Sequence, residues 1–387
     1  MAVVDSTRTV SEILARVLDG ERLADADALT LLQSKDLVSI GAAANEIRNR
    51  KANPGEVTYI VDRNINYSNV CVTDCNFCAF YRKPGDTREG YVLPKRVIFA
   101  KIEETIAVGG TGCLMQGGHN PDLTIEWYED LFRSIKERYP KFHLHALSPP
   151  EVTFISRRAR LSIAETISRL RDAGLDSIPG GGGEILVDRV RAILAPKKTK
   201  SEEWLEVMRQ AHRQGMSTSA TMMYGHVETL QERVDHMRKL RDLQDEVPGF
   251  RAFISWTFQP DNTELGKTVN ETPTSFEYLL VQAVSRLYFD NIPHIQSSWV
   301  TQGMKIGQVA LHFGADDLGS IMLEENVVSS AGTTYRATSE DFCRVIRNAG
   351  YRPVQRDTYY RVVDADPEAT LRARAAEAEA AVAQATG

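Results

Sequence analysis

Apolar residues in the first fifty positions of the chain recur with the period of an amphipathic helix. Spacings of i, i+3, i+4, i+7 and i+8 are occupied by Val10, Ile13, Leu14, Val17 and Leu18. The pattern predicts a helix with Ser11 as its N-cap and an end at Gly20, followed by two more amphipathic segments over residues 25–48. We therefore expect residues 1–55 to form a helical lead-in packed on the barrel. This segment contains no candidate catalytic or binding residues.

From Val57 onward the pattern changes to short apolar runs that alternate with longer helical segments, which predicts βαβ units and a parallel sheet. The predicted strands are residues 57–65, 113–116, 142–147, 175–178, 217–223, 252–258, 292–299 and 308–313. Predicted helices include residues 127–138, 162–173, 204–214 and 276–288, and one that ends at 102–108. The fold class is therefore α/β, with a TIM-type (βα)8 barrel over residues 56–365. Residues 366–387 are expected to form a helical or disordered tail.

The composition excludes some classes of protein but does not identify the function. The chain has 387 residues, 42% of them hydrophobic, which suits one large α/β barrel or two average domains. A net charge of −6 gives no electrostatic case for a nucleic acid partner, and no apolar run of about 18 residues suggests a membrane span. Five cysteines, three of them clustered, argue against disulfides and for a reducing compartment. The expected location is the cytoplasm.

The cluster of thiols is the strongest chemical signal in the sequence. Cys71, Cys75 and Cys78 have the spacing CxxxCxxC, and three thiolates on one tight loop can hold a [4Fe–4S] cluster with one iron left open. Zinc is the alternative, but structural zinc normally takes four protein ligands, and no second pair follows. The spacing resembles that of the radical S-adenosylmethionine (radical SAM) enzymes. That resemblance implies that the open iron binds SAM and that Phe77 lies near its adenine.

Polar and glycine-rich stretches follow several predicted strands, and in a βα barrel these strand ends meet around one mouth. Gln116, Gly117 and Gly118 end the second strand, where glycines let a ligand approach the backbone; an ordinary turn is the alternative. The radical SAM resemblance implies a Gly-Gly-Glu motif here that receives the SAM ammonium. This chain departs from it, with Gln116 before the glycines and His119 after them.

Glu184 follows a run of four glycines, Gly180 to Gly183, at the end of the fourth predicted strand. No Gly-Lys-Ser/Thr follows, so this is no P-loop, and we expect Glu184 to accept the hydroxyls of a ribose unless the loop is only a flexible connection. By position Lys198 would pair with the SAM carboxylate, although a lone lysine is more often solvated. Ser148, at the end of the third strand, is also assigned to the cofactor.

Three histidines are candidate proton acceptors because imidazole titrates near neutral pH: His119, His145 and His226. Each has an ordinary alternative as a core, loop or surface residue. The predicted substrate contacts come from the strand ends, and core packing is equally expected for the tryptophans. These contacts are Asn120, Tyr224, Trp256, Gln259, Ser298 and Trp299.

A wider resemblance covers residues 20–360. Segments 71–80, 115–123, 143–151, 178–186, 202–212, 221–229 and 253–260 are similar to the dehypoxanthine futalosine cyclases, radical SAM enzymes of the futalosine route to menaquinone. Aminofutalosine synthases and FO synthases share the cysteine loop and the barrel. His119-Asn120-Pro121 directly after the glycine pair, the four-glycine loop and residues 221–226 favour the cyclases.

The resemblance implies a mechanism and its partners. A 5′-deoxyadenosyl radical, released from SAM by the reduced cluster, would take hydrogen from C4′ of a nucleoside-like substrate, and the C4′ radical would close onto the neighbouring benzoate ring. A reductant such as flavodoxin or ferredoxin would supply the electron. A non-catalytic iron–sulfur carrier and a zinc-stabilised binding module remain as alternatives, but both leave the polar strand ends unexplained.

Overall fold

The computed structural model describes residues 7–269 and 271–386, with side chains described up to residue 380; residues 1–6 of the predicted lead-in and 387 of the predicted tail lie outside this part. The α-helices are α1 (Val10–Leu18), α2 (Asp25–Gln33), α3 (Leu37–Lys51), α4 (Lys95–Ala107), α5 (Ile125–Arg138), α6 (Pro149–Ala159), α7 (Ile163–Asp172), α8 (Asp188–Leu194), α9 (Ser201–Arg213), α10 (Leu230–Glu246), α11 (Ser275–Tyr288), α12 (Trp299–Ala310), α13 (Ser339–Asn348) and α14 (Pro367–Thr386). The strands are β1 (Glu56–Ile60), β2 (Asp62–Ile65), β3 (Gly112–Met115), β4 (His143–Ala146), β5 (Thr218–Tyr224), β6 (Phe250–Thr257), β7 (His294–Gln296), β8 (Asp317–Ser320), β9 (Arg352–Arg356) and β10 (Val362–Asp364).

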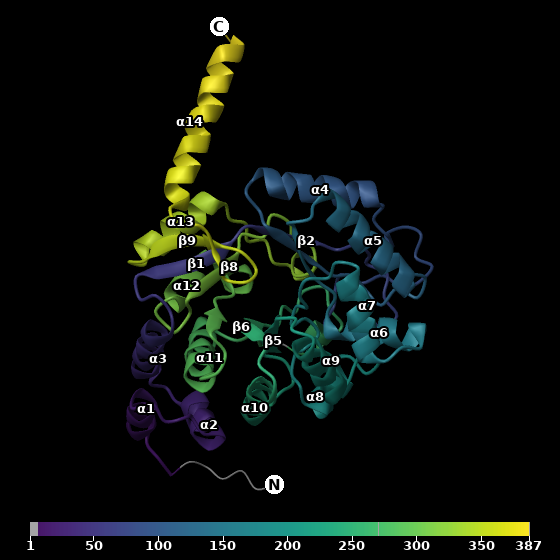
Figure 1. The fold of residues 1–387 in the computed structure, drawn as a ribbon. Helices are drawn as coiled ribbons and strands as arrows, with labels where there is room; N and C mark the ends of the chain where they lie inside the picture. The colour runs from purple at the N-terminus through teal and green to yellow at the C-terminus, as the bar shows by residue number, and fades with distance from the viewer. Residues whose placement is uncertain (1–6, 270, 387) are drawn as a thin grey trace.

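The strands close into a parallel barrel with helices on its outside (Figure 1). Two sheets, ordered β10-β9-β1-β8-β7-β6-β5 and β2-β3-β4, share the continuous segment 56–65 as β1 and β2. On the other side, single bridges from His145 to Ser177 and from Ile178 to Thr218 connect β4 with β5. The predicted barrel is confirmed, although its fourth strand is reduced to these two bridges.

Segment 56–65 closes the ring because its two halves pair with different neighbours. β1 pairs in parallel with β8 and β9, whereas β2 pairs with β3. Its side chains alternate, as a strand requires. Val57, Tyr59 and Val61 are buried in an outer apolar layer, while Ile60 and Asp62 face the interior of the barrel.

The lead-in helices pack on the barrel's outer helices: α3 lies against α11, and α2 contacts both α10 and α11. The three predicted helical segments are confirmed, but the predicted N-cap is wrong. Thr9, and not Ser11, caps α1, because Thr9 forms a reciprocal capping box with Glu12. No helix in the described ranges is long and apolar enough to cross a membrane.

The eighth predicted strand is misplaced, and the seventh contains β7 but extends too far at its end. Residues 308–313, predicted as strand eight, form the end of α12 and the turn after it, and Ser297–Trp299 of predicted strand seven lead into the same helix. A short apolar alternation fits a helix end as well as a strand; α12 ends at Ala310, and Gly314 with φ +93° lies in the turn that follows. The true eighth strand, β8, has the sequence Asp-Leu-Gly-Ser and lacks a β-branched signal.

Residues 352–364 form a hairpin-like element, β9 and β10, that the pattern analysis did not predict. β9 adds to β1 beside the barrel, and the turn after it covers the amino-terminal end of the lumen. Tyr359 packs edge-on against His143 with ring centroids 4.7 Å apart, and Tyr360 stacks on His294 at 3.8 Å. Helices α6, α8, α10 and α13 were also not predicted. The tail is helical as α14, which projects away from the barrel in Figure 1.

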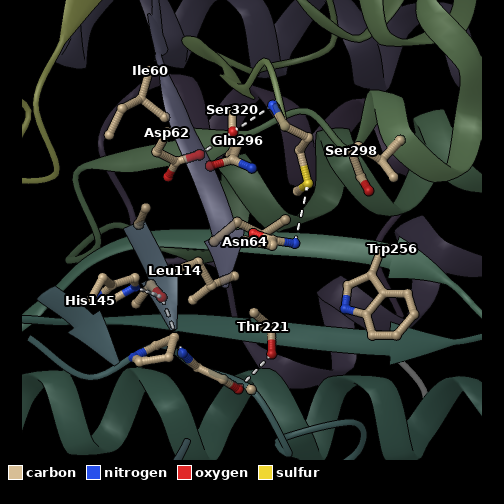
Figure 2. Close-up of a pocket in the computed structure, with 18 of the residues that line it drawn as sticks. Ile60, Asp62, Asn64, Leu114, His145, Thr221, Trp256, Gln296, Ser298 and Ser320 are labelled. Atoms are coloured by element: carbon tan, nitrogen blue, oxygen red, sulfur yellow. Dashed lines mark hydrogen bonds between the residues drawn. The ribbon is translucent and has the colours of Figure 1, made fainter. Parts of the chain in front are cut away.

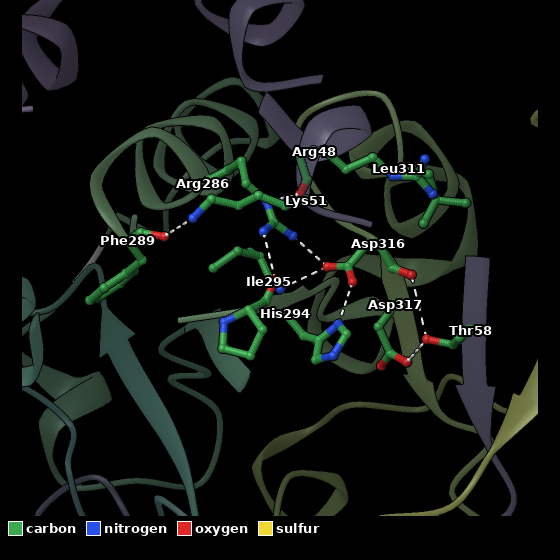
Figure 3. Close-up of polar contacts among 12 residues, drawn as sticks. Arg48, Lys51, Thr58, Arg286, Phe289, His294, Ile295, Leu311, Asp316 and Asp317 are labelled. Carbon is green, nitrogen blue, oxygen red and sulfur yellow. Dashed lines mark hydrogen bonds and ion pairs between the residues drawn. The ribbon is translucent and has the colours of Figure 1, made fainter. Parts of the chain in front are cut away.

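A buried ion cluster connects α11 to the chain just before β8 (Figure 3). Arg286 is fully buried and donates to Asp316 and to the carbonyls of Gly314 and Pro293, the latter two at 2.7 and 2.9 Å. Asp316 also accepts from His294 at 2.6 Å and from the Ile295 N–H at 2.9 Å. Burial raises the pKa of Asp316, but Arg286 and His294 outweigh it and hold that pKa well below the ordinary value.

Removing one partner of this cluster should be costly. Arg286→Met leaves Asp316 buried without its main cation, so we expect the free energy of unfolding to fall by about 3–5 kcal/mol. Chemical denaturation monitored by circular dichroism measures it. The double variant Arg286→Met/Asp316→Asn should recover a clear part of the loss, because it also removes the uncompensated charge. A single variant as stable as the parent protein would contradict the assignment.

Candidate active site

The lumen of the barrel holds a cavity of about 320 Å³. The side chains that line it alternate along each strand with those that face the helices, which is the expected arrangement of a barrel interior. Those drawn and labelled in Figure 2 are Ile60, Asp62, Asn64, Leu114, His145, Thr221, Trp256, Gln296, Ser298 and Ser320. The glycine loop 180–182 and Glu184 complete the wall near the carboxyl ends of the strands.

Asp62 is an acidic group in this wall. The Ser320 hydroxyl donates to its carboxylate, and the same hydroxyl accepts from the Met322 N–H at 2.8 Å. In Figure 2 Asp62 lies beside Gln296 and Ser320. Burial raises the pKa of Asp62 to about 6, and the Ser320 hydrogen bond and Arg356 oppose that rise only in part. Asp62 is therefore a carboxyl group that changes charge close to neutral pH.

The cysteine loop follows β2 and lies against the end of β3. Cys71 accepts from the His119 N–H at 3.3 Å, and the sulfur atoms of Cys71 and Cys75 lie 2.8 and 3.6 Å from the Thr73 hydroxyl. Burial raises the pKa of Cys75 to about 11 and also raises that of Cys78. Iron ligation needs thiolates, so cluster binding would release these protons.

The donor chemistry of this loop fits an iron–sulfur cube, in which each thiolate binds a different iron atom. Across the described ranges, no group of three or more His, Cys, Asp or Glu side chains converges on a point that would hold a single metal ion. The other two cysteines lie elsewhere: Cys113 is buried in β3, and Cys343 on α13 lies 3.6 Å from the Tyr59 hydroxyl. Neither is placed as a fourth ligand in this loop.

The glycine pair after β3 allows the cysteine loop to approach closely. A Cβ atom at Gly118 would lie 2.3 Å from the Val70 carbonyl oxygen and 2.7 Å from the Cys71 Cβ. At Gly117 it would lie 2.5 Å from the ring of Tyr67. Both positions therefore exclude a side chain for packing reasons, whatever ligand they also contact.

Glu151, at the start of α6, ties two strand ends together. Its carboxylate accepts from the Gly117 N–H at 2.9 Å, from the Tyr67 hydroxyl at 2.7 Å, and from the N–H and hydroxyl of Ser148 at 2.7 and 2.6 Å. The hydroxyl of Ser148, a predicted cofactor contact, is thus occupied by a capping box. Burial raises the pKa of Glu151 despite these four donors.

Four predicted cofactor residues gather around the glycine loop. Glu184 is buried and pairs with Lys198 at 2.8 Å and with Arg191 at 3.4 Å. The Lys198 ammonium also lies 5.1 Å from the ring centroid of Phe77. A Cβ at Gly181 would lie 2.4 Å from the Gln116 amide nitrogen, so Gln116 borders the same loop.

Electrostatics keep Glu184 ionised. Burial raises its pKa, but Lys198 and Arg191 outweigh burial and bring the pKa below the ordinary value. Burial likewise lowers the pKa of Lys198, and Glu184 raises it above the ordinary value overall. A carboxylate has about four acceptor positions, so two cations leave Glu184 capacity for ribose hydroxyls.

The three predicted proton acceptors occupy different environments. His145 lines the cavity and lies 2.6 Å from the Ser177 hydroxyl, and burial holds its pKa well below the ordinary value. His119 stacks on Phe154, next to the cysteine loop, and burial lowers its pKa to about 3. His226 is buried between the Met223 carbonyl and Glu228, and it does not line the cavity.

Of the six predicted substrate residues, three line the cavity and three do not. Trp256, Ser298 and Trp299 line the cavity, with the Trp299 indole N–H donating to the Ser320 carbonyl at 2.8 Å. The other three residues do not line it. Asn120 is buried against Ser68, Tyr224 packs under Arg233, and Gln259 donates to Thr257.

Two residues that the pattern analysis did not single out hold central positions. Asp62 is an acid in the middle of segment 56–65, and the polar residues at every second position, Asp62, Asn64 and Asn66, were an available signal for a polar lumen. Glu151 stands in a Ser-x-x-Glu sequence, which indicates a capping box. Its contact with Gly117 across two strand ends had no sequence signal.

Comparisons with known proteins agree along nearly the whole chain. A family model described as "Radical SAM superfamily" matches residues 65–240, and one described as "CofH/MqnC C-terminal region" matches residues 247–369. Cyclic dehypoxanthine futalosine synthase of Halalkalibacterium halodurans is 48% identical over 355 residues, 92% of this chain and 95% of that protein. Aminodeoxyfutalosine synthase of Thermus thermophilus is 41% identical over 357 residues, 91% of this chain and 95% of that protein.

A solved structure supports the fold alone. The crystal structure of methylornithine synthase superposes with a TM-score of 0.67 at 20% sequence identity, covering 88% of this chain and 97% of that chain. The two proteins thus share the barrel fold, but their sequence identity is too low to support an argument about function.

The raised pKa of Asp62 predicts a pH dependence of stability. The ordinary pKa is 3.8, so the folded protein binds the Asp62 proton more tightly than the unfolded chain does. The contribution of Asp62 to the free energy of unfolding is therefore fully present below about pH 4 and is lost as pH rises through about 6. With about 1.4 kcal/mol per pKa unit, the loss is on the order of 2–3 kcal/mol. Asp62→Asn should therefore gain stability relative to the parent protein between pH 4 and pH 8. Equal pH profiles of the melting temperature in the two proteins would contradict this.

Proposed function

Since this chain belongs to the radical SAM enzymes, in the family that includes cyclic dehypoxanthine futalosine synthase and aminodeoxyfutalosine synthase, we propose that it cyclises dehypoxanthine futalosine in menaquinone biosynthesis. The cofactors of this family are a [4Fe–4S] cluster and S-adenosylmethionine. We assign the cluster to Cys71, Cys75 and Cys78, whose spacing matches it. When bound, the two cofactors supply a 5′-deoxyadenosyl radical that takes a hydrogen atom from the substrate.

One observation supports this proposal above the others. The ion pair of Glu184 and Lys198 links the two parts of the site, because Glu184 lines the cavity and Lys198 lies over Phe77 of the cysteine loop. A ligand bound at the glycine loop would therefore have the cluster loop on one side and the barrel lumen on the other. An iron–sulfur carrier or a zinc module would have no use for such a cavity.

The chain's own residues would position ligands and exclude water. Glu184 would hold a ribose, Lys198 would face a ligand carboxylate, and Gln116 would accept from an ammonium group, with Gly117 and Gly118 giving backbone access. Trp256 and Trp299 would supply apolar walls that keep a reactive intermediate from solvent. Phe77 would lie against the adenine.

Proton transfer needs a base that reaches the substrate. His145 is placed for it among the three candidate histidines, because it alone lines the cavity. It is also neutral at physiological pH, as an acceptor must be. His119 would instead contribute next to the cluster loop, and His226 would position the turn after β5 through Glu228.

The remaining partners follow from the chemistry. The substrate is a small nucleoside-like molecule, and we propose a flavodoxin or ferredoxin as the source of the priming electron. We also propose that the protein acts in the reducing cytoplasm, where its cysteines stay reduced. Aminodeoxyfutalosine synthase activity is the second candidate, because that relative shares 41% identity and the same barrel.

Single thiol replacements test the cluster assignment. Cys75→Ala should abolish both the brown colour and SAM cleavage, because three thiolates are the minimum that hold the cube with one open iron. Cys113→Ala is the matched control, since this thiol is buried in β3 away from the loop. Iron content and 5′-deoxyadenosine formation measure the outcome. Full iron and SAM cleavage in Cys75→Ala would refute the assignment.

Isotope transfer tests the reaction. Dehypoxanthine futalosine deuterated at C4′ should give 5′-deoxyadenosine that carries one deuterium, together with a cyclised product, both measured by mass spectrometry. Deuterium that stays in the product would exclude abstraction at C4′. Consumption of the synthase's enolpyruvyl-benzoate substrate, with dehypoxanthine futalosine untouched, would instead identify the chain as the second candidate.

A further inference from the structure

The deep, amino-terminal end of the lumen contains a cation without an acid. Arg251, the second residue of β6, lines the cavity, and its guanidinium makes no hydrogen bond or ion pair with any described residue. Its Nη1 is buried without a hydrogen-bond partner, and the guanidinium lies over the ring of Tyr359, 4.6 Å from the ring centroid. Burial lowers the pKa of Arg251 to about 10, so it remains a cation at neutral pH. A partly buried guanidinium with one unpartnered nitrogen and no ion pair is costly for the free protein.

A second unused donor faces the same cavity. Tyr360 lines the cavity, and its hydroxyl is buried without a hydrogen-bond partner. The ring is held firmly, because it stacks on His294 at 3.8 Å and lies 3.8 Å from the guanidinium carbon of Arg356. A phenol fixed in this way can point its O–H at a ligand without losing side-chain freedom.

The other charged groups in the lumen do not neutralise Arg251. Arg356 is matched by Asp317, with nitrogen–oxygen distances of 2.5 and 2.7 Å. Asp62 accepts from the Ser320 hydroxyl and forms no ion pair with Arg251. His145 is kept neutral by burial. Among the described residues no carboxylate forms an ion pair with Arg251, and Asp357, which is paired with Arg361, attracts it only from beyond ion-pair distance.

From these contacts we infer that Arg251 and Tyr360 form a carboxylate-binding subsite at the deep end of the lumen. A guanidinium offers paired N–H donors that match a carboxylate, and the Tyr360 O–H would add a third donor. The identity of the ligand rests on the proposed function: we take the bound group to be the benzoate carboxylate of the substrate. Arg251 lies near the start of β6 and Trp256 near its end, and both line the cavity with the glycine loop, so a benzoate bound at Arg251 would leave the ribose end of the substrate toward the carboxyl ends of the strands.

The test compares binding of an acid and its amide to the holoenzyme with SAM present. The parent enzyme should bind dehypoxanthine futalosine about 10- to 100-fold more tightly than its carboxamide, measured by isothermal titration calorimetry. Arg251→Met should lose most of this preference by weakening only the acid, and Tyr360→Phe should lose a smaller part. Tyr359→Phe is the matched control and should keep the full preference, because that hydroxyl does not line the cavity.

Benzoate and benzamide serve as fragment probes that do not depend on the proposed reaction. If dehypoxanthine futalosine fails to bind, the proposed function is wrong, yet benzoate that binds the parent enzyme and not Arg251→Met still supports the subsite. Visible absorbance of the cluster and circular dichroism confirm that each variant is folded and loaded. Equal loss of acid and amide in Arg251→Met, or an acid preference that survives it, overturns the inference.

Discussion

Closure of the barrel through one segment is the constraint on which the rest of the structure depends. Residues 56–65 pair with β8 and β9 through their first half and with β3 through their second, so no open edge remains between the first and last strands. The same alternation that buries Val57 and Tyr59 outward turns Ile60 and Asp62 inward. Closure thereby creates both the core and the lumen, and it fixes the end at which the cysteine loop emerges.

Some buried charged side chains have an ion-pair partner in this protein, and others do not. Arg286 and Asp316 satisfy each other outside the lumen, with carbonyl and backbone N–H partners for the remaining groups. Inside the lumen, and among the described residues, the guanidinium of Arg251 forms no ion pair and the Tyr360 hydroxyl forms no hydrogen bond, which is unfavourable for buried polar atoms. The completed pair stabilises the fold, and the unpartnered groups in the lumen are the basis of the carboxylate subsite inferred above.

Contacts between strand ends convert separate loops into one site. Glu151 binds the turn after β3 to the turn after β4, and the ion pair of Glu184 with Lys198 joins the glycine loop to the cysteine loop. Gly118 permits this arrangement by leaving room for Cys71. These contacts hold the turns after β3 and β4, the glycine loop and the cysteine loop next to one another beside the lumen.

The sequence by itself determined the features that depend on local order. The spacing of Cys71, Cys75 and Cys78 is readable because one short loop carries all three ligands, and the helical lead-in and most strands follow from the periods of their apolar residues. A local pattern failed where two structures share it, as at residues 308–313, whose apolar alternation belongs to the end of a helix.

Only the tertiary structure decided which polar residues share a surface. β8 has no strand signal because its residues are held by partners distant in sequence, such as Asp317 by Arg356. The same is true of Glu151 at Gly117, and of Arg251 and Tyr360, which lie on β6 and after β9 and meet one cavity through closure of the barrel. His226 and Tyr224 illustrate the converse, since strand-end positions alone did not bring them to the cavity. Pairing across a barrel is set by hydrogen bonds between remote segments, and a linear pattern carries no record of which segments meet.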